Sequence, residues 1–335
     1  MVKVAINGFG RIGRLALRLM AKDENFQVVA INTNSDAETL TYLLKYDTAH
    51  GNFMTDKITY KDNIIYVDGK EIITSRVKEP ENCNWGELGI DLVIDCTGKF
   101  NDRVAAEAHI KAGAKKVLLS APGKGDLKTV VYNVNHNILD GTETVVSAAS
   151  CTTNCLAPLA KVLNDEFGIV KGLMTTVHAY TNDQNIHDNS HKSGIRARRG
   201  RAAAANIVPA STGAAKTVGV VLPELKGRLD GIALRVPTIT GSVVDLTVEF
   251  GKNVTVEEVN NAIKNASNET LAYTEDPIVS SDVIGSSYAC IFDGLSTQII
   301  EADGKQLVKL IAWYDNEMSF THQLVRVAKY WGAMK

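Results

Sequence analysis

The feature that most constrains the fold lies at the start of the chain, where an apolar run leads directly into a glycine-rich turn. Residues 2–7 read as a buried strand, and the turn Gly8-Phe9-Gly10-Arg11-Ile12-Gly13 has the spacing G-x-G-x-x-G before a helical pattern. Gly8 permits the tight turn, Gly10 lets the backbone approach a pyrophosphate, and Gly13 lets helix and strand pack closely. Such a turn can be purely structural, but strand, motif and helix in this order favour dinucleotide binding.

Strand and helix patterns continue to alternate up to Ala149, apart from a short antiparallel excursion with a hairpin signal at Asp68-Gly69. This alternation predicts an α/β fold with a doubly wound, Rossmann-type cofactor domain over residues 1–150. Residues 151–318 read as an α+β catalytic domain with a largely antiparallel sheet, and residues 319–335 as a final helix.

The composition limits the classes of function that are open to the chain. Its 335 residues favour two domains, and a net charge of −2 argues against a dedicated nucleic-acid site or a membrane-surface protein. No stretch reaches 18 consecutive apolar residues, and the first apolar run is too short for a signal peptide. Five cysteines form no disulfide framework. We therefore expect a cytoplasmic protein without a membrane span.

The segment Ser150-Cys151-Thr152-Thr153-Asn154-Cys155 follows a strand and opens a helix. A thiol at a helix N-terminus, with a base nearby, can have a lowered pKa and act as a nucleophile, so we expect this of Cys151. A small buried packing residue is the alternative for Cys151, and it is our interpretation of Cys155. The pair has no second pair or close histidine at structural-zinc spacing, so no metal site is expected.

A histidine partner for this thiol follows at the end of the next strand pattern. His178 lies 27 residues after Cys151, which suits a helix out and a strand back. An imidazole at this position could activate the thiol and later carry a proton.

The second strand pattern ends in Asn32-Thr33-Asn34-Ser35, with no carboxylate before Asp36. A dinucleotide-binding domain usually places an acidic residue there against the ribose of NAD. Its absence also removes a repulsion of about 1–4 kcal/mol per unit charge against the 2′-phosphate of NADP. NADP is therefore admissible as a cofactor beside NAD.

Two further segments attract anions by their composition. The aperiodic stretch from His187 to Pro209 is rich in basic residues, and we favour a subunit-interface loop over an anion-binding loop. Ser211 to Lys216 opens a helix with hydroxyl residues and is a second candidate anion site. The basic residues of the loop are Lys192, Arg196, Arg198, Arg199 and Arg201.

Taken together, the motifs suggest oxidation of an aldehyde through a thioester. The most distinctive segments are Asn7 to Arg14, Ser150 to Pro158, His178-Ala179-Tyr180-Thr181, Ser211 to Lys216, Leu234-Arg235-Val236-Pro237 and Trp313-Tyr314-Asp315-Asn316-Glu317. With these segments the sequence closely resembles phosphorylating glyceraldehyde-3-phosphate dehydrogenase over essentially its whole length. The nucleophile segment is nearly diagnostic.

The resemblance implies a role for each matching residue. Cys151 would be the nucleophile and His178 its acid/base partner, while Thr181 and Arg235 would hold the phosphate of glyceraldehyde 3-phosphate. Inorganic phosphate would be held by Ser150, Thr153, Thr212 and Gly213, with Thr152 counted among the phosphate-site residues. The cofactor residues implied are Gly8, Gly10, Arg11, Ile12, Gly13, Thr33, Arg76, Thr97, Ser120 and Asn316. The resemblance also implies a homotetramer whose last helix returns to the cofactor domain.

Two departures from NAD-specific members point to NADP use. Thr33 stands where an aspartate is usual, and Asp188-Asn189-Ser190-His191 stands where a leucine-proline pair is common. The spacing between His191 and Arg201 also differs, which leaves the conformation of this loop open. Erythrose-4-phosphate dehydrogenase, which releases its thioester with water, is the alternative enzyme, and a non-catalytic binding or adhesion protein is the alternative class.

Overall fold

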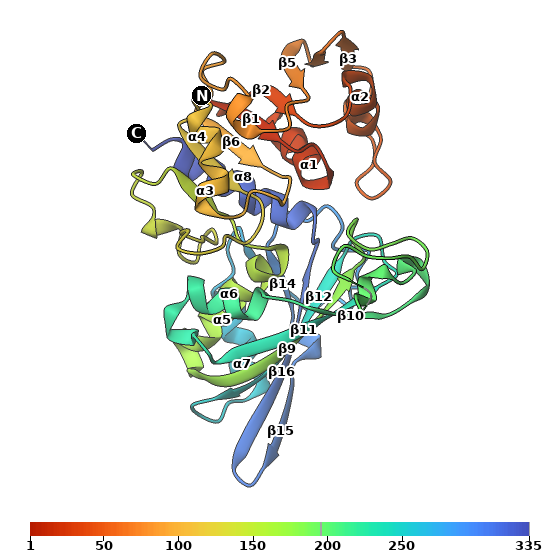
Figure 1. Ribbon diagram of the computed structural model, residues 1–335. Helices are drawn as coiled ribbons and strands as arrows, with labels where there is room; N and C mark the ends of the chain where they lie inside the picture. The colour runs from red at the N-terminus through yellow and green to blue at the C-terminus, as the bar shows by residue number, and fades with distance from the viewer. Residues whose placement is uncertain (195, 335) are drawn as a thin grey trace. The chain divides into compact units, whose positions relative to one another are not determined.

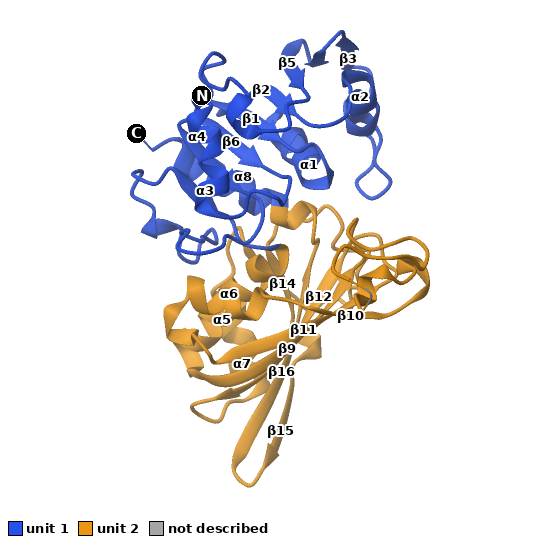
Figure 2. Cartoon of the chain, viewed as in Figure 1, with its two compact units in different colours: residues 1–150, 321–335 blue, residues 151–320 orange. Residues whose placement is uncertain are grey.

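The computed structural model describes residues 1–194 and 196–334. The chain divides into two compact units, residues 1–150 with 321–335 and residues 151–320 (Figure 2). No helix in the described part of the chain has the length and apolar character needed to cross a membrane.

Unit 1 contains an eight-stranded sheet in the order β3-β4-β5-β2-β1-β6-β7-β8 (Figure 1). Its strands are β1 (Val2–Asn7), β2 (Phe26–Asn32), β3 (Ile58–Lys61), β4 (Ile64–Val67), β5 (Lys70–Ser75), β6 (Leu92–Asp95), β7 (Lys116–Leu119) and β8 (Val145–Ser147). All neighbours pair in parallel except β3 with β4 and β4 with β5. The predicted antiparallel excursion is thus the edge of a doubly wound sheet.

The helices of unit 1 are α1 (Arg11–Met20), α2 (Ala37–Lys45), α3 (Arg103–Ala106), α4 (Ala108–Lys111) and most of α8 (Met318–Gly332). The sequence pattern of residues 103–112 predicts one helix, but this segment forms two short helices. The first is capped by Asp102, whose carboxylate accepts from the N–H of Ala105. The end of α8 is fastened to unit 1, because Lys116 Nζ donates to the carbonyls of Trp331 at 2.9 Å and Met334 at 2.8 Å.

Unit 2 contains the second sheet, in the order β10-β11-β9-β12-β16-β14-β13, with β15 paired to β16. Its strands are β9 (Ile169–Ala179), β10 (Val208–Ser211), β11 (Leu229–Val236), β12 (Ser242–Phe250), β13 (Leu271–Thr274), β14 (Cys290–Asp293), β15 (Gln298–Ala302) and β16 (Lys305–Tyr314). Only β9 with β11 and β13 with β14 pair in parallel. The predicted α/β fold with a largely antiparallel second domain is confirmed, although β10 and β13 were not predicted.

Three helices pack on one face of this sheet, namely α5 (Cys151–Phe167), α6 (Ala214–Val221) and α7 (Val256–Asn265) (Figure 1). Strand β12 alternates buried and part-exposed residues along its whole length, as expected where only one face is covered. His178 belongs to the face that is covered by helices, and this places it beside the start of α5.

Candidate active site

Cys151 is the first residue of α5, and a strained turn precedes it. Ala149, which is fully buried, has a φ of 61°, in the left-handed region that residues with a Cβ rarely adopt. The strained turn leads directly into the helix, so the thiol lies at the positive end of the α5 dipole. No glycine marks this turn, so the sequence contained no signal for it.

The thiol and the imidazole meet within unit 2. Cys151 Sγ lies 3.4 Å from His178 Nε2, and His178 Nδ1 lies 2.7 Å from the carbonyl oxygen of Ala179. A carbonyl can only accept, so Nδ1 carries the hydrogen and the lone pair of Nε2 faces the sulfur. The neutral imidazole is therefore oriented to take the thiol proton.

The ionisation of this pair differs from the sequence-based expectation. Burial raises the pKa of the Cys151 thiol, and the nearby Arg235 guanidinium opposes this only in part. Burial and the same guanidinium, whose Nη1 lies 3.2 Å from Nδ1, lower the pKa of His178 to about 3. The expected lowered thiol pKa is thus wrong, because desolvation outweighs the nearby positive charge. Both groups are neutral at pH 7, so the thiol proton has to move to Nε2 as the sulfur reacts.

Arg235 also organises the residues expected at the substrate phosphate. Its Nη1 donates to Thr181 Oγ1 at 2.8 Å and to the carbonyl of Ala179 at 3.2 Å. Thr181 Oγ1 donates to the carboxylate of Asp183, which also forms an ion pair with Arg199. Burial raises the pKa of Asp183, but the bonds from Thr181 and Arg199 outweigh it and hold the pKa below its ordinary value. Asp183 thus links the basic loop to the site, a role that sequence reasoning missed.

Tyr314 is a second residue of the site that sequence reasoning missed. Its hydroxyl lies 2.8 Å from Thr152 Oγ1 and 2.8 Å from Thr176 Oγ1, in a buried cluster behind the thiol and imidazole. The Thr152 hydroxyl is thus held on the side of Tyr314. Thr153 is fully buried and Ser150 is part-buried.

The second candidate anion site is the start of α6. Gly213 is the N-cap residue and makes no side-chain capping bond, whereas Thr212 Oγ1 accepts from the N–H of Ala214 at 3.2 Å. The hydroxyl that caps the helix is therefore that of Thr212 and not that of Ser211.

The glycine motif has the geometry of a phosphate-binding turn. Gly8 has a φ of 91°, and a Cβ on Gly13 would lie 2.2 Å from the Gly8 carbonyl oxygen. A Cβ on Gly10 would meet nothing within 4 Å, and Gly10 caps α1 without any side-chain bond. The N–H groups at the start of α1, those of Arg11 and Ile12 included, are thus approachable by a pyrophosphate. These residues fit a dinucleotide.

The remaining cofactor candidates of unit 1 follow the carboxyl ends of its strands. Thr33 follows β2, Arg76 follows β5, Thr97 follows β6 and Ser120 follows β7. The guanidinium of Arg11 forms an ion pair with Asp47, so Arg11 would serve a cofactor through its backbone.

Asn316, the last cofactor candidate, belongs to unit 2 and is buried. Its Oδ1 accepts from Ser242 Oγ at 2.8 Å, which orients the side chain with Nδ2 as its donor end. The neighbouring Asp315 holds this corner together, since its carboxylate accepts from Thr240 and from the N–H groups of Gly285, Glu317 and Met318.

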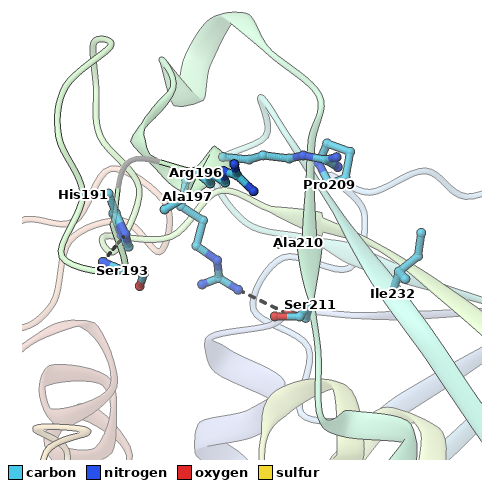
Figure 3. Close-up of a pocket in the computed structure, with 10 residues that line it drawn as sticks. His191, Ser193, Arg196, Ala197, Pro209, Ala210, Ser211 and Ile232 are labelled. Carbon is cyan, nitrogen blue, oxygen red and sulfur yellow. Dashed lines mark hydrogen bonds between the residues drawn. The ribbon is translucent and has the colours of Figure 1, made fainter.

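The basic loop and residues of β10 and β11 line an open cavity of about 530 Å³, and Cys151 is not among its lining residues (Figure 3). Arg196, Arg198 and Arg199 line it together with His191 and Ser211, and an Arg199 nitrogen lies 3.5 Å from the Ser211 carbonyl oxygen. Ile195 lies outside the described residues. The expected role of this loop at a subunit interface, favoured over anion binding, stays a prediction.

A doubly wound dinucleotide-type unit joined to an α+β unit with a cysteine–histidine pair is the architecture of a two-domain, nicotinamide-dependent dehydrogenase. Comparison with family models matches residues 2–103 to the NAD binding domain of glyceraldehyde 3-phosphate dehydrogenase and residues 150–316 to its C-terminal domain. The chain belongs to the glyceraldehyde-3-phosphate dehydrogenase family.

Curated relatives agree over almost the full length. The chain is 59% identical over 330 residues to glyceraldehyde-3-phosphate dehydrogenase of Clostridium pasteurianum, and 57% identical over 330 residues to that of Clostridium acetobutylicum. It is 57% identical over 331 residues to the same enzyme of Streptococcus pyogenes. Each comparison covers 98% of both chains, and none favours the erythrose-4-phosphate alternative.

Proposed function

We propose that this chain is an NAD-dependent, phosphorylating glyceraldehyde-3-phosphate dehydrogenase that acts in glycolysis or gluconeogenesis. The observation that carries the proposal is the 3.4 Å approach of Cys151 Sγ to the unprotonated Nε2 of His178, at the start of a helix. A general base this close to a thiol can take its proton while the sulfur attacks the carbonyl carbon, so no standing thiolate and no lowered thiol pKa are required.

The chemistry starts when Nε2 of His178 takes the thiol proton and Cys151 Sγ bonds to the aldehyde carbon. The same proton returns to the former carbonyl oxygen and gives a thiohemiacetal. His178 then takes the hydroxyl proton as the carbon loses hydride, which leaves a thioester on Cys151. Bound NAD supplies the hydride acceptor. Inorganic phosphate displaces the thiolate and releases 1,3-bisphosphoglycerate.

The substrate phosphate would lie against Thr181 and Arg235, and the attacking phosphate against Ser150, Thr153, Thr212 and Gly213. A guanidinium, hydroxyls and helix N-termini are the groups that bind dianions. Gly8, Gly10, Arg11, Ile12 and Gly13 would hold the pyrophosphate. Thr33, Arg76, Thr97 and Ser120 would line the rest of the cofactor, and Asn316 Nδ2 would donate to the nicotinamide amide. In domain terms, residues 1–150 with the last helix would bind the cofactor, and residues 151–318 would catalyse.

The test is turnover of glyceraldehyde 3-phosphate with NAD, with and without inorganic phosphate. Cys151→Ser should reduce kcat at least about 1,000-fold, because a serine hydroxyl is a far weaker nucleophile at neutral pH. Cys155→Ala is the matched control, since Cys155 is fully buried one turn along the same helix. Activity retained by Cys151→Ser, or turnover that ignores phosphate, would contradict the proposal.

We further propose that NADP is used at least comparably to NAD. Asn32, the last residue of β2, spends its amide on Asn7, Ser75 and Val77, and the next residue is the uncharged Thr33. Exposed Arg76 is available to a 2′-phosphate. The measurement is kcat/KM with each cofactor for the wild type and for Thr33→Asp, which should lose NADP use selectively by at least about tenfold. A strong NAD preference in the wild type ends this idea.

A homotetramer is supported by the face of the unit 2 sheet that α5, α6 and α7 leave uncovered. By strand register it exposes Leu173, Ile232, Ile300 and Leu307, whose exposed fractions range from 44% to 68%. Apolar surface of this kind marks an interface. Sedimentation should give four times the chain mass. Leu173→Glu should dissociate the assembly, and Leu295→Glu, at a residue that is 59% exposed outside this face, should not. A monomeric wild type would contradict the proposed tetramer.

All five cysteines are free thiols, which supports a reducing, cytoplasmic location.

A further inference from the structure

A chain of hydrogen-bonded side chains crosses the carboxyl ends of four adjacent strands in unit 1. Ser75, Asn32, Asn7 and Asp95 are the last residues of β5, β2, β1 and β6, which are neighbours in the sheet. The loops that follow these strands contain the cofactor candidates Arg76, Thr33, Gly8 and Thr97. We call this set, together with His109 and Trp85 described below, the strand-end chain.

The first links of the strand-end chain join β5, β2 and β1. Ser75 Oγ donates to Asn32 Oδ1 at 2.9 Å, and Asn32 Nδ2 donates to Asn7 Oδ1 at 2.8 Å. Asn32 also bonds both the N–H and the carbonyl of Val77, at 2.8 and 2.9 Å. Each amide is used from both ends, so neither side chain can rotate without breaking a bond to a neighbouring strand.

Asp95 is the next member of the strand-end chain and anchors the loop that contains Thr97. Its Oδ2 accepts from Asn7 Nδ2 at 2.8 Å, and its Oδ1 accepts from both the N–H and the hydroxyl of Thr97, at 2.9 and 2.6 Å. Asp95 is only 2% exposed, so it relies on these donors in place of water. The position of the Thr97 loop therefore follows from the orientation of the Asp95 carboxylate.

His109, which lies in α4, is fully buried at the far end of the strand-end chain from Ser75, and it is not among the catalytic, phosphate or cofactor candidates. Its Nε2 lies 3.2 Å from Asp95 Oδ2, and Trp85 Nε1 donates to its Nδ1 at 3.0 Å. An indole N–H can only donate, so Nδ1 is the acceptor and Nε2 carries the hydrogen that points at Asp95. Trp85 thus selects the tautomer that supplies Asp95 with a donor.

We propose that His109 is a positioning residue for cofactor binding: with its tautomer fixed by Trp85, it orients Asp95 and so holds the Thr97 loop in place for the dinucleotide. His109 contacts none of the cofactor candidates and acts through Asp95. The inference rests on the proposed dinucleotide function of unit 1. It adds a residue 12 positions after Thr97 (109 − 97 = 12) that no spacing rule would select.

The test compares His109→Leu with His109→Gln. Leucine leaves both Asp95 Oδ2 and the Trp85 N–H without this partner, whereas a glutamine carbonyl and amide can replace the acceptor and the donor. Calorimetric Kd values for NAD should rise about tenfold in His109→Leu and stay within about threefold of wild type in His109→Gln. At saturating NAD, kcat should stay within about twofold in both, as should the alkylation rate of Cys151 in cofactor-free protein.

Trp85→Phe keeps His109 and an aromatic ring at position 85 but removes the N–H donor that selects the His109 tautomer, and it decides the matter if His109→Leu does not fold. Its histidine ¹⁵N shifts should show the loss of the single Nε2–H tautomer that the wild type shows, with a weakened NAD affinity. Wild-type NAD affinity in His109→Leu or in Trp85→Phe, or a fall in kcat equal to the loss in affinity, overturns the inference. A wild type that fails to bind NAD overturns the proposed function instead.

Discussion

The sharpest prediction compares two glycines of the same motif, because the structure assigns them different physical roles. A Cβ on Gly13 would lie 2.2 Å from the Gly8 carbonyl oxygen and 3.2 Å from the Ile6 side chain. The first distance is about 1 Å shorter than an ordinary van der Waals contact, and the atom that the Cβ would meet is a main-chain oxygen. In Gly13→Ala, α1 must therefore shift away from β1 by about that distance.

The expected cost of Gly13→Ala is about 1–3 kcal/mol of unfolding free energy, the usual range for overpacking. At about 2–4 °C per kcal/mol, thermal unfolding of cofactor-free protein should begin several degrees lower. The same 1 Å shift displaces the pyrophosphate turn, so NAD affinity should fall on the order of 100-fold.

Gly10→Ala is the matched variant, since its Cβ meets nothing within 4 Å and its φ of −75° suits alanine. The free energy of unfolding of the cofactor-free protein should change by less than about 1 kcal/mol, the cost of alanine at an N-cap. NAD affinity should nevertheless fall, because the methyl group occupies the approach to the helix N-terminus. A Gly13→Ala protein as stable as wild type would refute the close-packing argument, and a Gly10→Ala protein with unchanged NAD affinity would refute the phosphate site.

Two further predictions concern unit 2. Asp315→Ala removes the acceptor of the Gly285, Glu317 and Met318 N–H groups. Chemical denaturation should show that the free energy of unfolding falls by about 3 kcal/mol, and a loss below about 1 kcal/mol would contradict this. His178 has a folded pKa of about 3, against about 6.5 when unfolded, so the unfolded state binds the proton first as the pH falls below 6.5. Relative to His178→Asn, the wild type should therefore lose roughly 2–3 kcal/mol of stability between pH 7 and pH 4.5, and parallel stability curves for the two proteins would exclude the depressed pKa.

Local sequence determined the first unit well because its signals are local. A strand, three glycines and a helix follow one another within about 20 residues, and each glycine answers a short-range steric demand. The prediction of a single helix over residues 103–112 was wrong, because no local signal in the sequence marks the break after Ala106. Strand β10 was missed because its partner β11 is more than 20 residues away along the chain.

The sequence by itself determined which groups the candidate active site contains: a thiol at a helix start, an imidazole at a strand end, and an arginine one residue before the end of β11. Only the tertiary structure decided their state. Ionisation depends on everything packed around a group, so burial leaves both Cys151 and His178 neutral although the local motif predicts a lowered thiol pKa. The tautomers of His178 and His109 were likewise set by Ala179 and Trp85, through contacts that exist only after folding.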